Sequence, residues 1–174
     1  MACNSIALNG ITAHCDSAPG GLKEVYIAEA SDVSSLTYDE SDNNISKIEM
    51  VTGKKFKKYT FRPGNCSFTS TFTSDQTTGS AYWTSELSLV FTKADSAKRL
   101  EIYALVTDDV VAIAQDKAGG YIYIGDENPV NATAGTHETG TASSDKNAYS
   151  LTLSSESAQP PHFVDASIVA ALVE

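Results

Sequence analysis

Residues 82–125 read YWTSELSLVFTKADSAKRLEIYALVTDDVVAIAQDKAGGYIYIG and contain three patterns in succession. Up to Thr92, apolar and polar residues alternate with a period of two, which is typical of a strand with one buried face. Thr92 followed by Asp95 resembles a capping box, and Leu100, Tyr103 and Ala104 then recur at helical spacing, so we expect a short α-helix over about 95–107. Residues 110–114 and 121–124 flank a turn that ends in two glycines, which predicts a hairpin.

Three other segments have the composition of strands. Residues 66–73, CSFTSTFT, alternate between apolar or small side chains and serine or threonine. The polar stretch 75–80 turns this segment back towards residues 82–93, so the two are expected to form an antiparallel pair with one Thr/Ser face. Residues 22–30 and 148–154 complete the set. The sequence therefore predicts a mainly β fold: an antiparallel β-sandwich or rolled β-barrel with one short α-helix.

The chain has 174 residues, 41% of them hydrophobic, which is enough for one sizeable core. We therefore expect a single domain, with an N-terminal arm over 1–21, a long loop or arm over 31–62 and a C-terminal tail over 159–174. Residues 126–144 are a second polar segment, expected to be a loop or a loosely held strand. The tail includes the apolar run FVDASIVAALVE, which must pack on the protein's own core or on a partner.

Charge is distributed unevenly along the chain. The formal net charge is -10, and six of the 12 basic residues lie within 47–62, whereas only Lys117 and Lys146 follow Leu100, against 11 acidic residues. The second half is therefore expected to present a negative surface, which argues against recognition of nucleic acid through its phosphates. No apolar stretch approaches the roughly 20 residues that span a bilayer, and the start lacks the pattern of a signal peptide, so we expect no membrane partner and assembly in the cytoplasm.

Two oppositely charged clusters lie close together in the sequence. The acidic cluster is Asp32, Asp39, Glu40 and Asp42, and the basic cluster is Lys54, Lys55, Lys57 and Lys58. The lysines alternate with aromatic residues, so they can protect a solvated edge strand against aggregation. The two clusters can also form a contact arm, in which each meets the opposite charge on another copy of the protein. These two interpretations do not exclude each other. Binding of nucleic acid by the basic cluster is disfavoured by the overall acidity.

The sequence shows no catalytic constellation, so we expect no enzymatic activity and no cofactor. His14, His137 and His162 are expected in loops or arms, without a Ser/His/Asp arrangement around them. The acidic pairs, Asp108 with Asp109 and Asp126 with Glu127, are interpreted as surface charge at the ends of strands and the helix. Cys3, His14 and Cys15 lack the ligand number and spacing of a zinc site, so no metal is expected.

The order of these segments resembles a known family. A start with Cys15, Asp16, Gly20 and Gly21 leads into LKEVYIA. Paired Thr-rich strands, the helix FTKADSAKRLEIYAL, the hairpin VVAIAQDKAGGYIYIGDEN, a Gly/Thr-rich loop and SSDKNAYSLTLSSESAQPPHFVD then follow. This succession resembles tail-tube-like virion proteins of tailed bacteriophages, in particular those of phages with Bacteroidetes hosts.

The resemblance implies a self-assembling structural protein located in the virion tail. Such proteins form hexameric rings that stack into a tube, inner strands join across subunits around the channel, and a long loop reaches the adjacent ring. It implies that the clusters in 31–62 mediate ring stacking and that DNA is a passing, non-specific cargo. The residues implied to face the channel are Thr69, Thr71, Thr73, Thr84, Glu86 and Ser88.

The same fold would also suit a neck, ring or head-decoration protein of a phage, in contact with other virion proteins. A soluble ligand- or carbohydrate-binding β-sandwich is the alternative from another class, and it would require exposed aromatic residues clustered on one sheet face.

Overall fold

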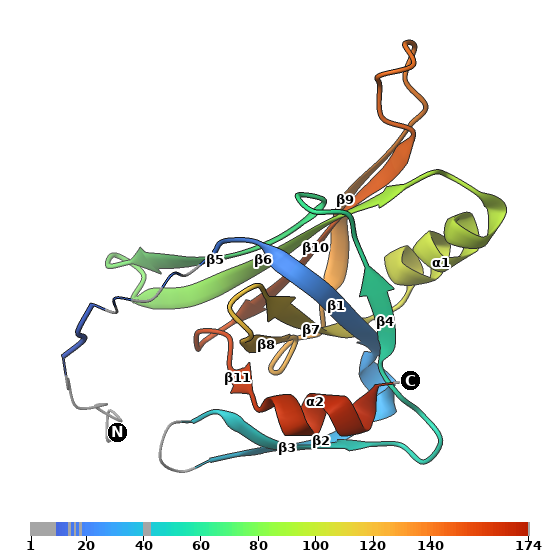
Figure 1. Cartoon of the computed structure of the whole chain (residues 1–174). Helices are drawn as coiled ribbons and strands as arrows, with labels where there is room; N and C mark the ends of the chain where they lie inside the picture. The colour runs from blue at the N-terminus through green and yellow to red at the C-terminus, as the bar shows by residue number, and fades with distance from the viewer. Residues whose placement is uncertain (1–9, 14, 16, 18, 40–42, 174) are drawn as a thin grey trace.

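The computed structural model describes residues 10–13, 15, 17, 19–39 and 43–173, and within them the strands form two separate sheets (Figure 1). The larger sheet has seven strands, in the order β2 (Val33–Tyr38), β3 (Ile45–Met50), β11 (Phe163–Val164), β8 (Tyr121–Ile124), β7 (Val110–Asp116), β1 (Leu22–Glu29) and β4 (Lys57–Thr60). The smaller sheet has four strands, in the order β5 (Cys66–Asp75), β6 (Ser80–Thr92), β10 (Ala148–Ser157) and β9 (Asn131–Glu138). The mainly β fold with packed sheets is confirmed.

The smaller sheet is antiparallel throughout, and the hairpin predicted between its first two strands is confirmed. Leu87 and Leu89 of β6 lie opposite Phe68 and Cys66 of β5. Both leucines are buried, whereas Glu86, which precedes Leu87, is exposed, and Ser88 between the leucines is half-buried. The period-two pattern in the sequence therefore separates a core face from an outer face, as expected for a sheet packed on one side.

The larger sheet is buried on both faces, which explains why β7 is apolar without interruption. Ala112 and Ala114 of β7 join the core between the two sheets, and Val111 and Ile113 join a second core on the opposite face. The small alanine side chains face the neighbouring sheet, and the larger branched ones face the second core. A strand covered on both sides needs no polar alternation.

The second core is covered by the C-terminal segment. Helix α2 (Ala166–Leu172) places Val169 against the larger sheet, with 2% of its surface exposed. The chain end is held further by Phe56, whose backbone N–H donates to the carbonyl of Leu172 at 3.0 Å. The apolar tail thus packs on the protein's own core, and the larger sheet lies between the smaller sheet and α2 (Figure 1).

Helix α1 (Ser96–Thr107) is where the sequence predicts it, but its N-cap and its packed face differ from the expectation. Asp95 is the N-cap and accepts a hydrogen bond from the Lys98 backbone N–H at 2.9 Å, whereas Thr92 ends β6. The buried residue of α1 is Leu105. Leu100 and Tyr103, expected on the packed face, are 64% and 69% exposed. The apolar residues of α1 lie on both sides of the helix, so spacing alone did not identify the packed face.

Four further expectations need correction. The segment 31–62 is not a long loop, because it folds as the short 3-10 helix η1 (Ala30–Asp32), strands β2 and β3, and β4. The rolled β-barrel is not formed, since the described strands belong to two open sheets. The larger sheet is mixed, because β11 and β3 run parallel. A second helix, α2, lies in the tail, whereas residues 131–138 form β9, the strand that was the stated alternative to a loop in that segment. In each case short strands or a short helix gain their stability from tertiary packing, which local composition does not show.

Among the described residues, no helix is both long enough and apolar enough to cross a membrane.

Glu24 on β1 gives a pH-dependent contribution to stability. Its carboxylate lies 2.8 Å from Lys58 Nζ and accepts a hydrogen bond from the Tyr26 hydroxyl at 2.7 Å. These two contacts, the Lys58 bond first, lower the pKa of Glu24. A group with a lowered folded-state pKa stabilises the fold above its unfolded pKa, and this contribution is lost as pH falls through the folded pKa.

We therefore expect the melting temperature of Glu24→Gln to fall less than that of the natural protein when pH is lowered from about 7 to about 3. Thermal unfolding at both pH values measures the difference, and Lys58→Met, which removes the partner, should behave in the same way. An unchanged pH dependence in both variants would contradict this role of Glu24.

Candidate assembly surfaces

The outer face of the smaller sheet collects all six residues that the resemblance assigns to a channel. Thr69 lies directly opposite Glu86, and Thr71 lies opposite Thr84. Ser88 and Thr73 occupy the same face, each two residues further along its strand. The structure therefore brings these side chains together on one surface, because residues of like parity on paired strands share a face.

Strands β10 and β9 extend this surface with residues of the same chemistry. Thr152, Ser154 and Glu156 of β10 lie opposite Ser88, Glu86 and Thr84. Asn131 of β9 lies opposite Ser154 and so extends the row that contains Glu86 and Ser154. We call this four-strand surface the polar face. Its strand residues, all of which the structure describes, include no lysine or arginine, and its charged members are the acids Asp75, Glu86, Glu138 and Glu156. A face of hydroxyls and carboxylates attracts water and repels phosphate.

Both edges of the smaller sheet lack a paired strand within the described chain. β5 pairs on one side with β6, and β9 pairs on one side with β10. The alternating directions of four antiparallel strands make β5 and β9 run in opposite senses. Unpaired edges present a row of free backbone N–H and C=O groups, which are templates for a further strand.

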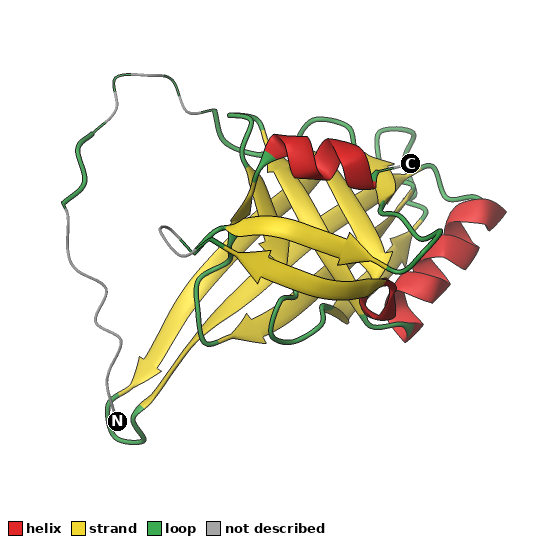
Figure 2. Ribbon diagram, turned by 90° about the horizontal axis from the view of Figure 1, so that it is seen from below, coloured by secondary structure: helices red, strands yellow, loops and turns green. Residues whose placement is uncertain are grey.

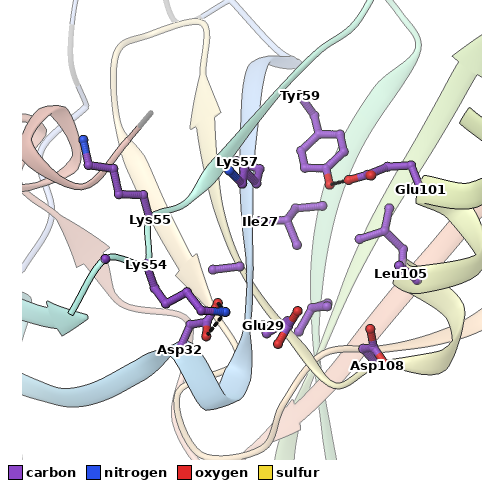
Figure 3. A pocket seen from close by; sticks show the side chains of 14 residues that line it. Ile27, Glu29, Asp32, Lys54, Lys55, Lys57, Tyr59, Glu101, Leu105 and Asp108 are labelled. Atoms are coloured by element: carbon purple, nitrogen blue, oxygen red, sulfur yellow. Dashed lines mark hydrogen bonds and ion pairs between the residues drawn. The ribbon is translucent and has the colours of Figure 1, made fainter. Parts of the chain in front are cut away.

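The basic cluster lies along β4 and the loop before it, beside a cleft of about 440 Å³ between β1, β4 and α1 (Figure 3). Lys54 Nζ lies 3.0 Å from Asp32 Oδ1, so one pair of the two expected clusters is made within the chain. Lys58 is paired with Glu24, and Lys57 also has a partner. Lys55 is exposed and extends away from the cleft in Figure 3. Lys55 is therefore the lysine whose charge is most available to another molecule.

The acidic cluster is only partly described. Asp32 faces Lys54, and Asp39, near the end of the β2–β3 hairpin, is exposed and has an interaction of its own. Glu40 and Asp42 lie outside the described residues. The ring-stacking role of both clusters stays a prediction.

The polar groups that line the cleft beside the lysines are a tyrosine, carboxylates and the lysines themselves. The Tyr59 hydroxyl donates to Glu101 across it (Figure 3), and burial, followed by this bond, raises the pKa of Tyr59. The other polar lining groups are surface lysines and carboxylates. Within the described part of the chain, no three His, Cys, Asp or Glu side chains are grouped to hold a metal ion. Cys3 and His14, considered as metal ligands from the sequence, fall outside the described residues.

His162 joins three segments that are distant in the sequence. Its Nδ1 lies 2.7 Å from the carbonyl oxygen of Asn43, and its Nε2 lies 3.2 Å from Asp126 Oδ2. The ring meets Tyr38 edge-on at 5.0 Å, and 8% of the residue is exposed. Asp126 is therefore half of a buried pair instead of surface charge. The imidazole fastens the β2–β3 hairpin to the turn after β8, a role with no signal in local sequence.

The other histidine and acids are placed as follows. His137 lies in β9, not in a loop, and stacks on Tyr149 at 4.2 Å. Glu127 accepts a hydrogen bond from the Ala158 backbone N–H at 2.6 Å. Asp108 and Asp109 are exposed at the end of α1, as expected of surface charge.

No protein-family model and no curated protein sequence matches the chain. Among solved structures, it is similar to a chain of the "Virion of native gene transfer agent (GTA) particle", with a TM-score of 0.34 and 14% sequence identity. The similarity covers 79% of this chain and 99% of that chain. At this TM-score, the similarity does not establish a shared fold.

Proposed function

We propose that this chain is a structural virion protein that assembles into stacked rings, forming the tail tube of a phage-like particle through which DNA passes. The observation that carries the proposal is the smaller sheet. Its two edges run in opposite directions and have no further strand among the described residues, and the strand residues of its outer face carry hydroxyl and carboxylate groups but no lysine or arginine. The order of elements in the sequence, which resembles tail-tube proteins, supports the same role. The role is structural and needs no catalytic group or cofactor.

Ring closure follows from the strand directions. When copies are related by rotation about one axis, the β5 edge of one copy meets the β9 edge of the next. Because these edges run oppositely, the junction is antiparallel and continues the alternation of the sheet. The closed sheet then has no unpaired edge within the ring, which removes the aggregation hazard of the free subunit.

The dimensions of such a ring fit a channel. Six four-stranded sheets give about 24 strands, which at about 4.8 Å spacing and about 40° tilt close a barrel about 48 Å across the backbone. Barrels of even 16–18 strands leave an aqueous channel. The polar face would form the channel wall, and its carboxylates would keep DNA phosphates from adhering. The second core and α2 would lie on the outside.

The proposal predicts that the purified protein polymerises. We expect negative-stain electron microscopy to show rings or tubes, with their fraction rising with protein concentration. Lys55→Glu should weaken stacking of rings more at low salt than at high salt, because a charge pair between exposed groups is screened. A protein that remains monomeric at every concentration and salt tested would contradict the tube. Rings that never stack would favour a neck or ring protein instead.

A further inference from the structure

The β5–β6 hairpin extends beyond the larger sheet and leaves apolar side chains uncovered. Figures 1 and 2 show the hairpin projecting from the body of the protein. Phe72 and Trp83, opposite each other near its tip, lie on the same side of the sheet as the buried Leu87. Their rings are 5.2 Å apart, and Phe72 is 52% exposed. The core-facing side of the sheet thus continues past the core that covers it.

A groove at the opposite edge of the same sheet has matching chemistry. It has a volume of about 420 Å³ and lies between α1 and the unpaired strand β9. Ile102 and Val106 of α1 form one wall, and Ala132 to His137 of β9 with Leu151 form the other. Val106 is 52% exposed. The β9 side is lined mostly by small residues, so an incoming strand can approach closely.

Strand register brings these two features together between copies. Within one copy, Phe68, Leu87, Leu153 and Ala132 form one row across the four strands. Four strands at about 4.8 Å spacing and about 40° tilt displace the next copy by about 16 Å, or about five residues. Because side chains must stay on their own faces, the displacement is an even number, about four or six.

Either displacement places Phe72 at the groove. With a displacement of four residues, Phe72 of one copy lies opposite Ala132 of the next copy. With a displacement of six residues, Phe72 lies opposite Gly135. A displacement of four residues in the opposite direction would place Gly64 opposite Ala132. Because Gly64 precedes β5, almost no residues of β5 would then pair with β9 of the next copy. Since Phe72 is on the core-facing side of β5 and α1 packs on the core-facing side of β9, the ring points towards Ile102 and Val106.

We infer that Phe72 is the apolar anchor between subunits, packing into the groove between α1 and β9 of the adjacent copy. The inference rests on the proposed ring, and it adds the side chain and the receiving site. A stable interface needs about 800 Å² per partner, and one aromatic side chain supplies about 150–250 Å². The strand ladder must therefore provide the remainder, so the anchor belongs in the same interface as the paired edges.

Two variants of the same hairpin test the anchor. Phe72→Thr removes the ring and keeps a residue suited to a strand, so the concentration needed for assembly should rise about ten- to hundredfold, as for loss of one buried aromatic group. Tyr82→Thr is the matched control, because Tyr82 is one position from Trp83 and faces the other side. Its assembly should stay close to that of the natural protein. Urea unfolding of the unassembled subunits verifies that both variants fold.

Cross-linking identifies the partner residue. In a background with Cys3 and Cys15 replaced by serine, one chain carries Phe72→Cys and a second carries Val106→Cys. Mixed and assembled, they should form a disulfide between the two chains on mild oxidation, and neither variant alone should do so.

The outcomes separate the inference from the proposed function. If the natural protein does not assemble, the proposed tube is refuted. If the natural protein assembles, two results would refute only the anchor role of Phe72: assembly of Phe72→Thr at the same concentration, or the absence of a cross-link between the mixed chains. Shielding of Phe72→Cys from a small thiol reagent in the isolated subunit would show that the same chain covers the site, which also overturns the inference.

Discussion

Val169→Asp is expected to destabilise the protein by about 3–5 kcal/mol, the usual cost of an uncompensated buried charge. Val169 is 2% exposed and joins the second core, which includes Phe56 and Ile113. The new carboxylate would have no cation beside it among the apolar residues of that core. Detaching α2 would also loosen β11, which links the β2–β3 hairpin to β8 in the middle of the larger sheet.

The neighbouring residue supplies the control. Ala170 is exposed on the same helix, so Ala170→Asp should change the free energy of unfolding by no more than about 0.5 kcal/mol. Urea unfolding followed by circular dichroism and by tryptophan fluorescence measures both variants. Equal effects of the two substitutions would mean that α2 does not cover the larger sheet in solution.

The second large effect concerns which face of the subunit lines the channel. Thr69 is exposed on the polar face, and Ala170 is exposed on the opposite side of the molecule, beyond the larger sheet. In a background without Cys3 and Cys15, Thr69→Cys and Ala170→Cys should both react with a maleimide carried on a protein-sized polymer when the subunits are free. In assembled tubes, labelling of Thr69→Cys by the polymer-linked maleimide should fall to background, because the polymer is wider than the channel and cannot enter it. Ala170→Cys should continue to react.

A small maleimide provides the control for accessibility. It should label Thr69→Cys in tubes as well as in subunits, since a small reagent enters a water-filled channel. Loss of reaction with both reagents would place Thr69 in a contact between subunits. Full reaction of the polymer with tubes would place the polar face on the outside and would refute the channel orientation. Cys66 is buried and does not need replacement.

The sequence was informative where one segment carries its own signal. The alternation in 66–73 and 82–92 predicted the β5–β6 pair, and the Gly-ending turn predicted the β7–β8 hairpin. The position of α1 was also predicted from the spacing of its apolar residues, although its N-cap is Asp95 and not Thr92. Six residues of the polar face on β5 and β6 could be named, since parity along a strand fixes which side chains lie together.

Features that depend on two distant segments had no such signal. The pairing of Lys54 with Asp32 and of Lys58 with Glu24 is fixed by how β1, β4 and η1 meet, so the two charge clusters could not be recognised as partly joined within the chain. His162 reads as a residue beside two prolines, and only the fold brings Asn43 and Asp126 to its ring.

The sequence by itself determined strands β5, β6 and β10 of the smaller sheet, the position of helix α1 and the chemistry of the polar face on β5 and β6, because hydrophobic period acts over a few residues. Only the tertiary structure decided that the 31–62 segment is a set of strands, that the tail adds β11 to the larger sheet and covers it with α2, and that α1 turns Leu100 and Tyr103 outwards. Short elements have little stability of their own, and the free energy that forms them comes from burial against distant parts of the chain.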